Sequence, residues 1–580
     1  MTISYSEAAA QVTAPGERFE VQPLEIRGIT YQAFVNAPPS LRELFDGARV
    51  RGDDVFLVYE DERWTFADVC RHIDAAAALL VDQLGIAKGD RVAIGMRNYP
   101  EWIIAFGAVL SIGAVSVSLN AWWTEDELDY ALEDCGAKVL VADEERALRA
   151  FASCQRLGIR TLVVRSERHD GVSLPSGTER WEDVLPLGSP LPAVEVLPDD
   201  DATILYTSGT TGRPKGAVST HRAIIQALLG FGCRAAIEAA RAASAGDGEP
   251  VPPATGVAAG KNPPVFILIV PLFHVTGSVP VMLGSLANGL KLVIMRKWDP
   301  ELALELIERE KVTNFVGVPT QSWDLLESPR FDDFDTSSLV SVGGGGAPAP
   351  PELVRRVASS FKSGGPSLGY GMTETNAYGP GNSGQDYLTH PTSTGRGTPI
   401  LQVEIRDPEG KPLPTGERGE IWLGGPHLFR GYWNNREATA EVLVEGWLRT
   451  GDLGRLDEDG FVYIEDRAKD MVLRGGENVY CAEVEAALYE HPGVYEAAVF
   501  GVPHERLGEE VAAAVYVRPG HTFSVEELQE FLGERIAKFK VPTRILLADA
   551  PLPRNAAGKI LKRSLRDDLR FGGWDASKTR

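Results

Sequence analysis

The 580-residue chain has few cysteines, few histidines and no excess of basic residues. Its five cysteines lie far apart, with no C-x-x-C pair or Cys/His cluster, so neither a zinc site nor a disulfide framework is indicated. A reducing cytoplasm is therefore the expected location. The formal charge of −23 disfavours non-specific attraction to nucleic acid or to an anionic membrane face.

A signal peptide and a clear membrane span are also missing. The N-terminus is polar and acidic rather than basic and then apolar. The most apolar stretch, Trp102 to Leu119, is barely long enough for a bilayer and is interrupted by Gly and Ser. We expect a buried helix that continues into a strand, and no integral membrane segment. The sequence leaves a monomer and a homodimer both open.

The chain is too long for one hydrophobic core, so at least two domains are expected. Helical periodicity over 68–85 and 102–112 alternates with β-rich runs at 91–95, 115–119 and 265–270, which predicts an α/β fold with parallel sheets. Short strands and turns from 401 to 464 predict a β-rich subdomain. We expect an N-terminal domain over 1–465, a hinge at 466–470 and a small α+β C-terminal domain over 471–580.

One turn has the composition of a phosphate-binding loop, in the string Tyr206-Thr-Ser-Gly-Thr-Thr-Gly-Arg-Pro-Lys-Gly216. Glycines let a backbone approach an anion closely, hydroxyls donate hydrogen bonds and a lysine adds a positive charge. The candidate residues are Thr207, Ser208, Gly209, Thr210, Thr211, Gly212 and Lys215. It is not a Walker A loop, because Pro214 precedes the lysine and Gly216 stands where Ser or Thr is required. A strand over 203–206 and a helix over 219–229 are expected to flank it.

This string resembles the signature of the superfamily of acyl- and aryl-CoA synthetases, adenylation domains and luciferases, which are AMP-forming enzymes. Taken alone, a turn rich in Gly, Ser and Thr would also suit an ordinary loop. Six further motifs match the same superfamily, and the resemblance extends from Tyr206 to Lys559. It implies ATP and Mg²⁺ as cofactors, coenzyme A as co-substrate and a mobile C-terminal domain.

The resemblance assigns nucleotide contacts to several motifs. The run Gly343 to Pro348 resembles a wall of the adenine pocket, with Gly345, Gly346, Ala347 and Pro348 as candidates. In the motif Gly369, Tyr370, Gly371, Met372, Thr373, Glu374, the tyrosine is implied to pack on adenine, the threonine to meet the α-phosphate and the glutamate to help bind Mg²⁺. Asp452 and Arg467 match contacts to the ribose.

The remaining motifs concern the hinge, the second substrate and the acid. Lys469 matches the hinge position, although Asp466 replaces the usual glycine before Arg467. Lys559 matches the lysine that reaches into the site during adenylation. Gly475, Gly476 and Glu477 resemble the loop on the CoA side. His274, Gly277 and Val318 are candidates for the acid pocket, and a core role for His274 is left open.

These motifs together predict an ATP-dependent carboxylic acid–CoA ligase that works through an acyl-adenylate. Members of the superfamily that adenylate amino acids usually place an aspartate near the phenylalanine that matches Phe273, to hold the amine. Residues 271–280 contain no acidic residue, so the resemblance implies an amine-free acid. Apolar residues nearby favour a medium- or long-chain fatty acid. Aryl and polycyclic or steroid acids stay open, as does an adenylating enzyme that loads a carrier protein. A non-catalytic nucleotide-binding module is a further alternative.

An Ala-, Gly- and Pro-rich segment over 233–264 is expected to be a surface insertion. Such a segment is either a loop without function or a lid over the site.

Overall fold

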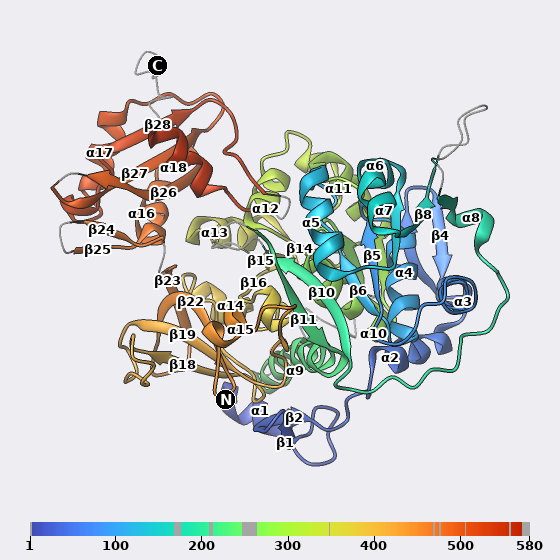
Figure 1. Cartoon of the computed structure of the whole chain (residues 1–580). Coiled ribbons are helices and arrows are strands. Elements are labelled where there is room, and N and C mark those ends of the chain that lie inside the picture. Colours follow the sequence, from blue (N-terminus) through green and yellow to red (C-terminus); the bar gives the residue numbers. More distant parts are fainter. Residues whose placement is uncertain are drawn as a thin grey trace.

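The computed structural model describes residues 3–166, 175, 177–207, 213–245, 264–346, 349–467, 470–474, 477–504, 506–555 and 558–570, with backbone only at 467, 478 and 568–570 (Figure 1). Two large α/β layers occupy one side of the molecule. A β-rich subdomain and the C-terminal domain lie one above the other on the opposite side.

The first large sheet has eight strands, and those from β10 through β6, β5, β7 and β8 to β9 pair in parallel. Its strands in order are β20 (Gly431–Tyr432), β11 (Lys215–Thr220), β10 (Asp201–Thr207), β6 (Val115–Ser118), β5 (Arg91–Gly95), β7 (Val139–Asp143), β8 (Arg160–Val164) and β9 (Thr178–Arg180).

The second large sheet also has eight strands and is parallel except at its two edges, where β17 and β4 run antiparallel to their neighbours. Its strands in order are β17 (Gly381–Ser383), β16 (Gly365–Gly369), β15 (Ser341–Gly345), β14 (Asn314–Gly317), β12 (Val265–Leu268), β13 (Lys291–Ile294), β3 (Val55–Tyr59) and β4 (Glu62–Thr65). The expected parallel α/β fold is thereby confirmed.

Three smaller sheets complete the fold. The β-rich subdomain holds β18 (Gln402–Arg406), β19 (Gly419–Gly424), β21 (Leu443–Val444), β22 (Trp447–Leu456) and β23 (Val462–Arg467). The C-terminal sheet holds β24 (Val472–Arg474), β25 (Glu477–Val479), β26 (Val494–His504), β27 (Gly508–Val517) and β28 (Arg544–Ala548). A hairpin of β1 (Val21–Ile26) and β2 (Ile29–Phe34) lies near the N-terminus.

Helices cover both faces of the large sheets. The main core lies between these sheets, where α2, α3 and α4 pack, and every residue of α4 is buried. The N-terminal and central helices are α1 (Tyr5–Val12), α2 (Leu41–Ala48), α3 (Phe66–Ala78), α4 (Pro100–Ser111), α5 (Glu125–Cys135), α6 (Glu144–Arg149), α7 (Phe151–Leu157), α8 (Trp181–Val184) and α9 (His221–Ala245). The later helices are α10 (Gly284–Asn288), α11 (Pro300–Glu310), α12 (Pro319–Leu326), α13 (Pro351–Ser360), α14 (Gly384–Thr389), α15 (Arg436–Val442), α16 (Cys481–Tyr489), α17 (Val525–Gly533) and α18 (Lys562–Arg570).

Alternation of side chains explains why the parallel strands are apolar throughout. In β5, Val92 and Ile94 join the core between the two sheets, whereas Ala93 faces the second core under α5 and α7. A strand buried on both faces needs a continuous apolar run. The apolar stretch from Trp102 forms α4 and then β6, as the sequence predicted.

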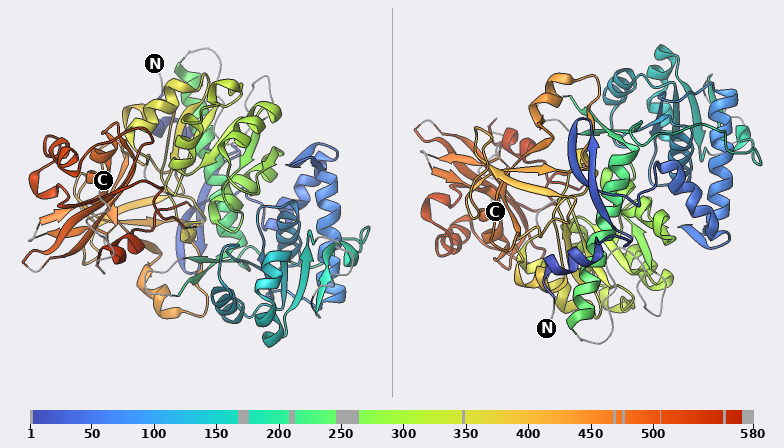
Figure 2. Two further views of the ribbon diagram at one scale, coloured as in Figure 1. Left: turned by 90° about the horizontal axis from the view of Figure 1, so that it is seen from above. Right: turned by 90° about the horizontal axis from the view of Figure 1, so that it is seen from below.

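Helix α9 is the one described helix long and apolar enough to cross a membrane, with a mean hydropathy of 1.4 over its most apolar window. Of that window, 56% is buried inside the protein. The hairpin β1–β2 lies alongside α9 (Figure 2), and Gln226 exchanges hydrogen bonds with the backbone of Phe34 at 2.9 and 3.0 Å. This packing is that of a core helix.

The strand predicted over 203–206 is confirmed as β10, and most of the helix predicted over 219–229 is confirmed in α9, but the prediction that the loop leads directly into that helix is wrong. Strand β10 is followed by a second strand, β11, which pairs antiparallel with it from Thr207↔Lys215 to Asp201↔Thr220. The helix begins only at His221, where the Thr220 hydroxyl accepts a hydrogen bond from the Ala223 N–H at 3.2 Å. Because β11 also pairs with β20, Lys215 lies in a sheet rather than at a helix N-terminus.

The expected surface insertion at 233–264 is wrong in its first part. Residues 233–245 continue α9, and Cys233, Ala235 and Ile237 are buried. Residues 246–263 lie outside the described part of the chain.

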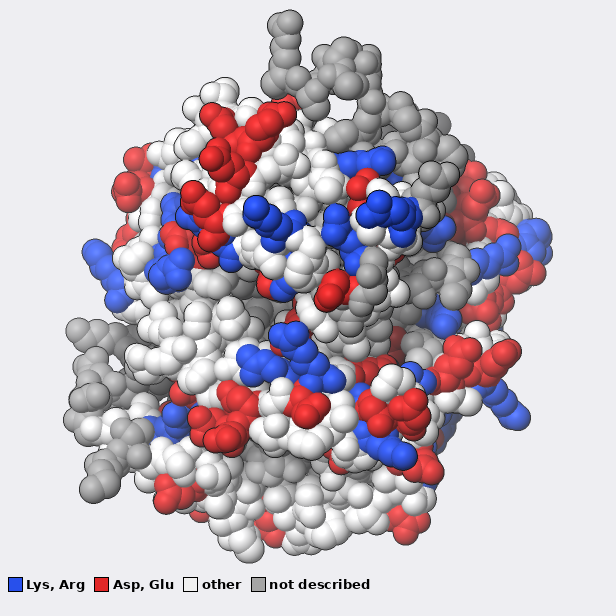
Figure 3. Space-filling view, turned by 90° about the vertical axis from the view of Figure 1, so that its left-hand side faces the viewer, with Lys and Arg blue, Asp and Glu red and all other residues white. Residues whose placement is uncertain are grey.

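The surface charge is mixed on the face seen in Figure 3, where Lys and Arg side chains are interspersed with Asp and Glu side chains. The five cysteines are free thiols and all are buried.

Candidate active site

A cavity of about 1740 Å³ lies where the large sheets, the β-rich subdomain and the C-terminal domain meet. The carboxyl ends of β6, β10, β15 and β16 open onto it, as is usual for ligand sites in parallel α/β sheets. It is lined by these residues predicted from the sequence: Thr207, Lys215, His274, Val318, Gly345, Gly346, Gly369, Gly371, Met372, Thr373, Glu374, Asp452 and Lys559.

Other predicted residues lie elsewhere. Gly277 is buried and does not line the cavity. A Cβ added to it would lie 2.2 Å from the carbonyl oxygen of Pro271. Glu477 is exposed on β25, away from the cavity. Ten candidates lie outside the described residues: Ser208, Gly209, Thr210, Thr211, Gly212, Ala347, Pro348, Lys469, Gly475 and Gly476.

The Glu374 carboxylate is held by a tyrosine from another strand. The Tyr432 hydroxyl in β20 donates to Glu374 Oε1 at 2.7 Å, and the Lys215 Nζ lies 5.1 Å from the centre of the Tyr432 ring. The backbone N–H of Phe429 also donates to the Glu374 carbonyl at 2.9 Å. Burial and the Glu374 carboxylate raise the pKa of Tyr432, so the phenol stays a donor.

Tyr432 was missed by the sequence reasoning. It belongs to no motif near Glu374 and lies 58 residues further along the chain. The pairing of β20 with β11 brings it beside both Lys215 and Glu374. No local pattern in the sequence signals this position.

The two residues predicted to contact the ribose are neighbours across a sheet. Asp452 in β22 pairs with Arg467 in β23, although the Arg467 side chain is outside the described part. Asp452 lines the cavity and accepts a hydrogen bond from the Tyr370 hydroxyl at 2.5 Å. Tyr370 itself does not line the cavity, and this contact joins the β-rich subdomain to the end of β16.

The glycine run from Gly343 serves strand packing as well as the cavity. A Cβ added at Gly343 would lie 1.9 Å from the carbonyl oxygen of Ser367, and one added at Gly344 would lie 1.7 Å from the carbonyl oxygen of Gly317. Only Gly346 is open, with φ of +81° and no heavy atom closer than 3.9 Å to its Cβ position. A side chain there would have space, but the residue would have a strained backbone conformation.

His274 lines the cavity as a neutral side chain. Burial lowers its pKa to about 4. The backbone N–H of Thr276 donates to its Nδ1 at 3.3 Å, so the proton of the neutral ring lies on Nε2. This arrangement suits a wall or a hydrogen-bond donor better than a general base.

Lys559 reaches the cavity from a tight turn in the C-terminal domain. The Lys559 N–H donates to the Asn555 side-chain oxygen at 2.9 Å, and the Asn555 N–H donates to the Lys559 carbonyl at 2.9 Å. Arg554 donates to the Gly558 carbonyl at 2.6 Å and pairs with Glu496 of β26 at 2.8 Å. The turn that carries Lys559 is therefore fixed to the C-terminal sheet.

At Gly558 this turn comes close to Val318, which lines the cavity and was predicted to line the acid pocket. It has φ of +81°, and an added Cβ would lie 2.9 Å from a methyl group of Val318. The C-terminal domain contacts the N-terminal part nearby as well, because Arg518 forms an ion pair with Glu327 and the Tyr495 hydroxyl donates to Asp324 at 3.1 Å. These contacts hold Lys559 at the cavity.

Comparison with known proteins places the chain in a family. The AMP-binding enzyme profile matches residues 44–433, and the AMP-binding enzyme C-terminal domain profile matches residues 483–559. The chain belongs to the AMP-binding enzyme family, as its motifs predicted.

Its relatives include CoA ligases. The chain is 36% identical to a feruloyl-CoA synthase of Amycolatopsis sp, over 88% of this chain and 94% of that protein. It is 35% identical to the long-chain-fatty-acid–CoA ligase FadD13 of Mycobacterium tuberculosis, over 87% and 93%. The solved ATP-bound MatB from Rhodopseudomonas palustris is 30% identical, with a TM-score of 0.77 over 91% and 99%.

Proposed function

We propose that this protein is an ATP-dependent carboxylic acid–CoA ligase that forms an acyl-adenylate and then a thioester, with release of pyrophosphate and AMP. The observation that carries the proposal is the convergence of Lys215, Thr373, Glu374, Asp452 and Lys559 on one cavity from separate parts of the chain. A non-catalytic nucleotide-binding module would need the ribose and base contacts but not this set of charges.

The nucleotide is proposed to lie between the strand ends. Asp452 would accept hydrogen bonds from the ribose hydroxyls, and Gly345 and Gly346 would border the adenine. Lys215 and the Thr373 hydroxyl would contact phosphate oxygens. The carboxylate of the acid then attacks the α-phosphorus, the bond to pyrophosphate breaks, and Lys559 stabilises the negative charge that develops between the two groups.

The residues present fit a Mg²⁺ ion that arrives with ATP. Mg²⁺ commonly takes one or two carboxylates together with phosphate oxygens, and Glu374 supplies one carboxylate at the cavity. Among the described residues no group of three or more His, Cys, Asp or Glu could hold a metal by itself, so phosphate ligands are needed. When bound, the ion offsets charge where carboxylate and triphosphate meet.

The thioester step requires a second arrangement of the domains. We propose that residues 471–580 rotate about Lys469, withdraw Lys559 and bring the segment Gly475–Glu477 to the cavity, so that the CoA sulfur attacks the acyl carbonyl and AMP leaves. The present position of Glu477, exposed and away from the cavity, supports such a change between the two steps. The free buried thiols support a cytoplasmic location.

The acid is proposed to be amine-free and of medium or long chain. Of the apolar residues that favour an alkyl chain, Val275 and Val318 line the cavity, whereas Leu272 and Val279 are buried in the core. The volume of about 1740 Å³ exceeds the roughly 300–1000 Å³ of a drug-sized site, which leaves room for ATP and a large acyl group together.

The test is AMP formation from ATP with fatty, aryl and polycyclic acids, each with and without CoA. AMP that depends on both an acid and CoA is the expected result. Pyrophosphate exchange without CoA-dependent turnover would identify an adenylating enzyme with another acceptor, such as a carrier protein. No turnover with any acid would overturn the ligase function.

A further inference from the structure

The part of the cavity that α9 lines is here called the tunnel, and it lies beyond the strand ends where the nucleotide is proposed. Both the first and the last residues of β16, Gly365 and Gly369, line it, as do Ser341 and Gly345 of β15. Four residue steps of a strand correspond to roughly 13 Å. The tunnel therefore extends from the carboxyl ends of these strands, where the nucleotide is proposed, to their amino ends.

Helix α9 provides one wall of this tunnel, and that wall has an apolar part and a charged part. Phe231, Ala235, Ala242 and Ala245 make an apolar part. Arg234, Glu238 and Arg241 also line the tunnel, at spacings of four and three residues that place them on one face of the helix. From Arg234 to Arg241 this polar strip covers about 10 Å at 1.5 Å per residue.

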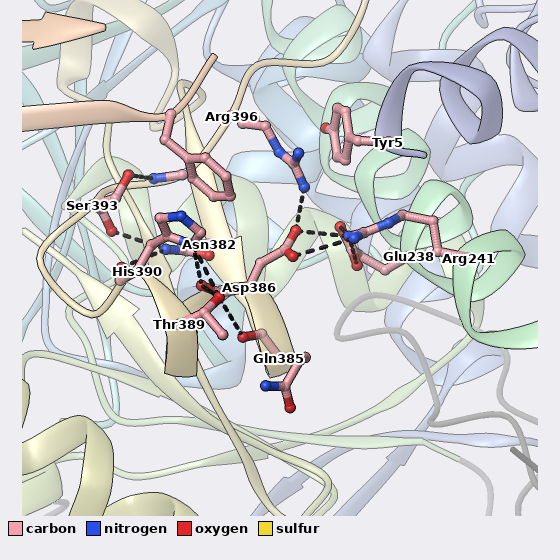
Figure 4. A network of polar contacts seen from close by, with 12 residues as sticks. Tyr5, Glu238, Arg241, Asn382, Gln385, Asp386, Thr389, His390, Ser393 and Arg396 are labelled. Atoms are coloured by element: carbon pink, nitrogen blue, oxygen red, sulfur yellow. Dashed lines mark hydrogen bonds and ion pairs between the residues drawn. The ribbon is translucent and has the colours of Figure 1, made fainter. Parts of the chain in front are cut away.

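The far part of the strip is internally paired. Arg241 binds Asp386 of α14 at 2.7 Å and Glu238 at 3.0 Å, and Arg396 also pairs with Asp386. Figure 4 shows Asp386 between the two guanidinium groups, with Tyr5 of α1 beside Arg396. Strand β17 runs antiparallel to β16, so the α14 residues that follow it lie towards the amino end of β16.

Arg234 differs from the other two arginines. It forms no ion pair with any carboxylate in the described part of the chain; its Nη2 donates to the carbonyl of Gly379, and its guanidinium lies 5.3 Å from the centre of the Tyr378 ring. Its buried Nε has no hydrogen-bond partner among the described residues, nor has that of Arg241. Of the five N–H donors of this group, one is paired with a protein acceptor in the described part of the chain.

From this arrangement we infer that the acid carries an oxygen acceptor remote from its reacting carboxylate, as a ketone, hydroxyl or second carboxylate, and that Arg234 binds this group. The inference rests on the proposed ligase function and specifies its substrate. A plain alkyl chain would displace water from an arginine that has no counter-ion among the described residues, which costs free energy. An acceptor on the chain restores the lost hydrogen bonds.

The experiment compares three acids with equal numbers of carbon atoms: a straight-chain alkanoic acid, the corresponding mid-chain keto acid and the dicarboxylic acid. CoA-dependent AMP formation gives kcat/KM for each acid with the wild-type enzyme, Arg234→Met and Arg222→Met. Arg222 is the matched control, since it lies on the same helix, pairs with Asp199 at 2.8 Å and does not line the tunnel.

We expect the wild-type enzyme to prefer at least one oxygenated acid over the alkanoic acid by about tenfold or more, because unpaired buried donors penalise an analogue that lacks the acceptor. Arg234→Met should remove that preference and improve the alkanoic acid, whereas Arg222→Met should keep it. Equal or better use of the alkanoic acid by the wild-type enzyme would overturn the assignment, even if Arg234→Met fails to fold. Equal effects of the two substitutions would overturn it as well. A complete lack of AMP with every acid would instead overturn the ligase function, and this assignment with it.

Discussion

At the scale of single residues, the site depends on side chains whose orientation is set by partners from other strands. Tyr432 holds one oxygen of Glu374 and presents its ring to Lys215. Lys559 is fixed by Asn555 and by the contact of Gly558 with Val318. In both cases the reactive group comes from a recognisable motif, but its position is decided by a residue outside that motif or in another domain.

Replacement of Lys559 by Ala tests the first half-reaction. We expect acid-dependent pyrophosphate exchange to fall about 100-fold or more, because a preorganised charge at the transition state is lost. Thioester formation from supplied acyl-AMP and CoA should be nearly unchanged. Lys538→Ala, at an exposed position of the same domain, is the control. Equal loss of both half-reactions in the Lys559 variant would refute this division of labour.

Replacement of Tyr432 by Phe tests the support of Glu374. The ring and its contact with Lys215 remain, while one hydrogen bond to the carboxylate is lost, at a cost of about 1.5 kcal/mol. We expect roughly a tenfold higher Mg²⁺ requirement in pyrophosphate exchange. A Mg²⁺ titration of the two enzymes at fixed ATP measures this requirement. Superimposable curves would show that the Tyr432 hydroxyl does not support Mg²⁺ binding by Glu374.

At the scale of elements, β10, β11 and β20 form one antiparallel unit at the edge of a parallel sheet. The unit brings Lys215 and Tyr432 together. Strand β23 joins the β-rich subdomain to the C-terminal domain. Asp466, near the end of this strand, is buried. Its carboxylate accepts a hydrogen bond of 2.5 Å from the backbone N–H of Cys481, the first residue of α16. Asp466, which stands where the family usually has a glycine, therefore ties β23 to α16.

Replacement of Asp466 by Gly tests this tie. We expect the C-terminal domain to leave the present arrangement more easily, because the hydrogen bond between the Asp466 carboxylate and the N-terminus of α16 is lost. Such a hydrogen bond stabilises the arrangement by about 1.5–3 kcal/mol. Pyrophosphate exchange should fall severalfold while thioester formation from supplied acyl-AMP is kept or increased. Asp459→Gly, in an exposed turn of the same subdomain, serves as the control. Parallel decreases in both activities would show that Asp466 does not bias the domain arrangement.

At the scale of the whole molecule, stability depends on histidines kept neutral inside the core. His221 and His427 are fully buried, and burial lowers their pKa values to about 4 and about 3. Below pH 6.5 the unfolded chain binds protons at these positions that the folded protein does not. The free energy of unfolding should therefore decrease as the pH falls from 6.5 towards 4.

Denaturant unfolding between pH 7 and pH 5 measures this slope. Each buried histidine contributes up to about 1.4 kcal/mol per pH unit below its unfolded pKa. We expect His427→Gln to flatten the slope relative to the wild-type protein, whatever its effect on stability at pH 7. His521→Gln, at an exposed position, should leave it unchanged. Identical slopes in all three proteins would contradict the buried neutral state of His427.

The sequence alone predicted much of the fold, because strands and helices buried in a parallel sheet leave apolar runs of characteristic length. Strand β5 coincides with the predicted run 91–95, and α4 lies within two residues of its predicted limits. The prediction for the segment after Lys215 missed strand β11. This strand is stabilised by pairing with β10 and β20, and such pairing has no local signature in the sequence. For the same reason, the helical continuation from 233 to 245 was missed, since it depends on burial against α1 and the β1–β2 hairpin.

What the sequence determined by itself is the chemistry of the site: the order and identity of hydroxyls, carboxylates and lysines in contiguous motifs, and with them the family. Only the tertiary structure decided which of these groups share a cavity, which partner orients each of them, and what the acid meets along α9. Contacts such as Tyr432 with Glu374, or Gly558 with Val318, join residues 58 or more positions apart. They follow from strand order and domain packing, which no short stretch of the chain encodes.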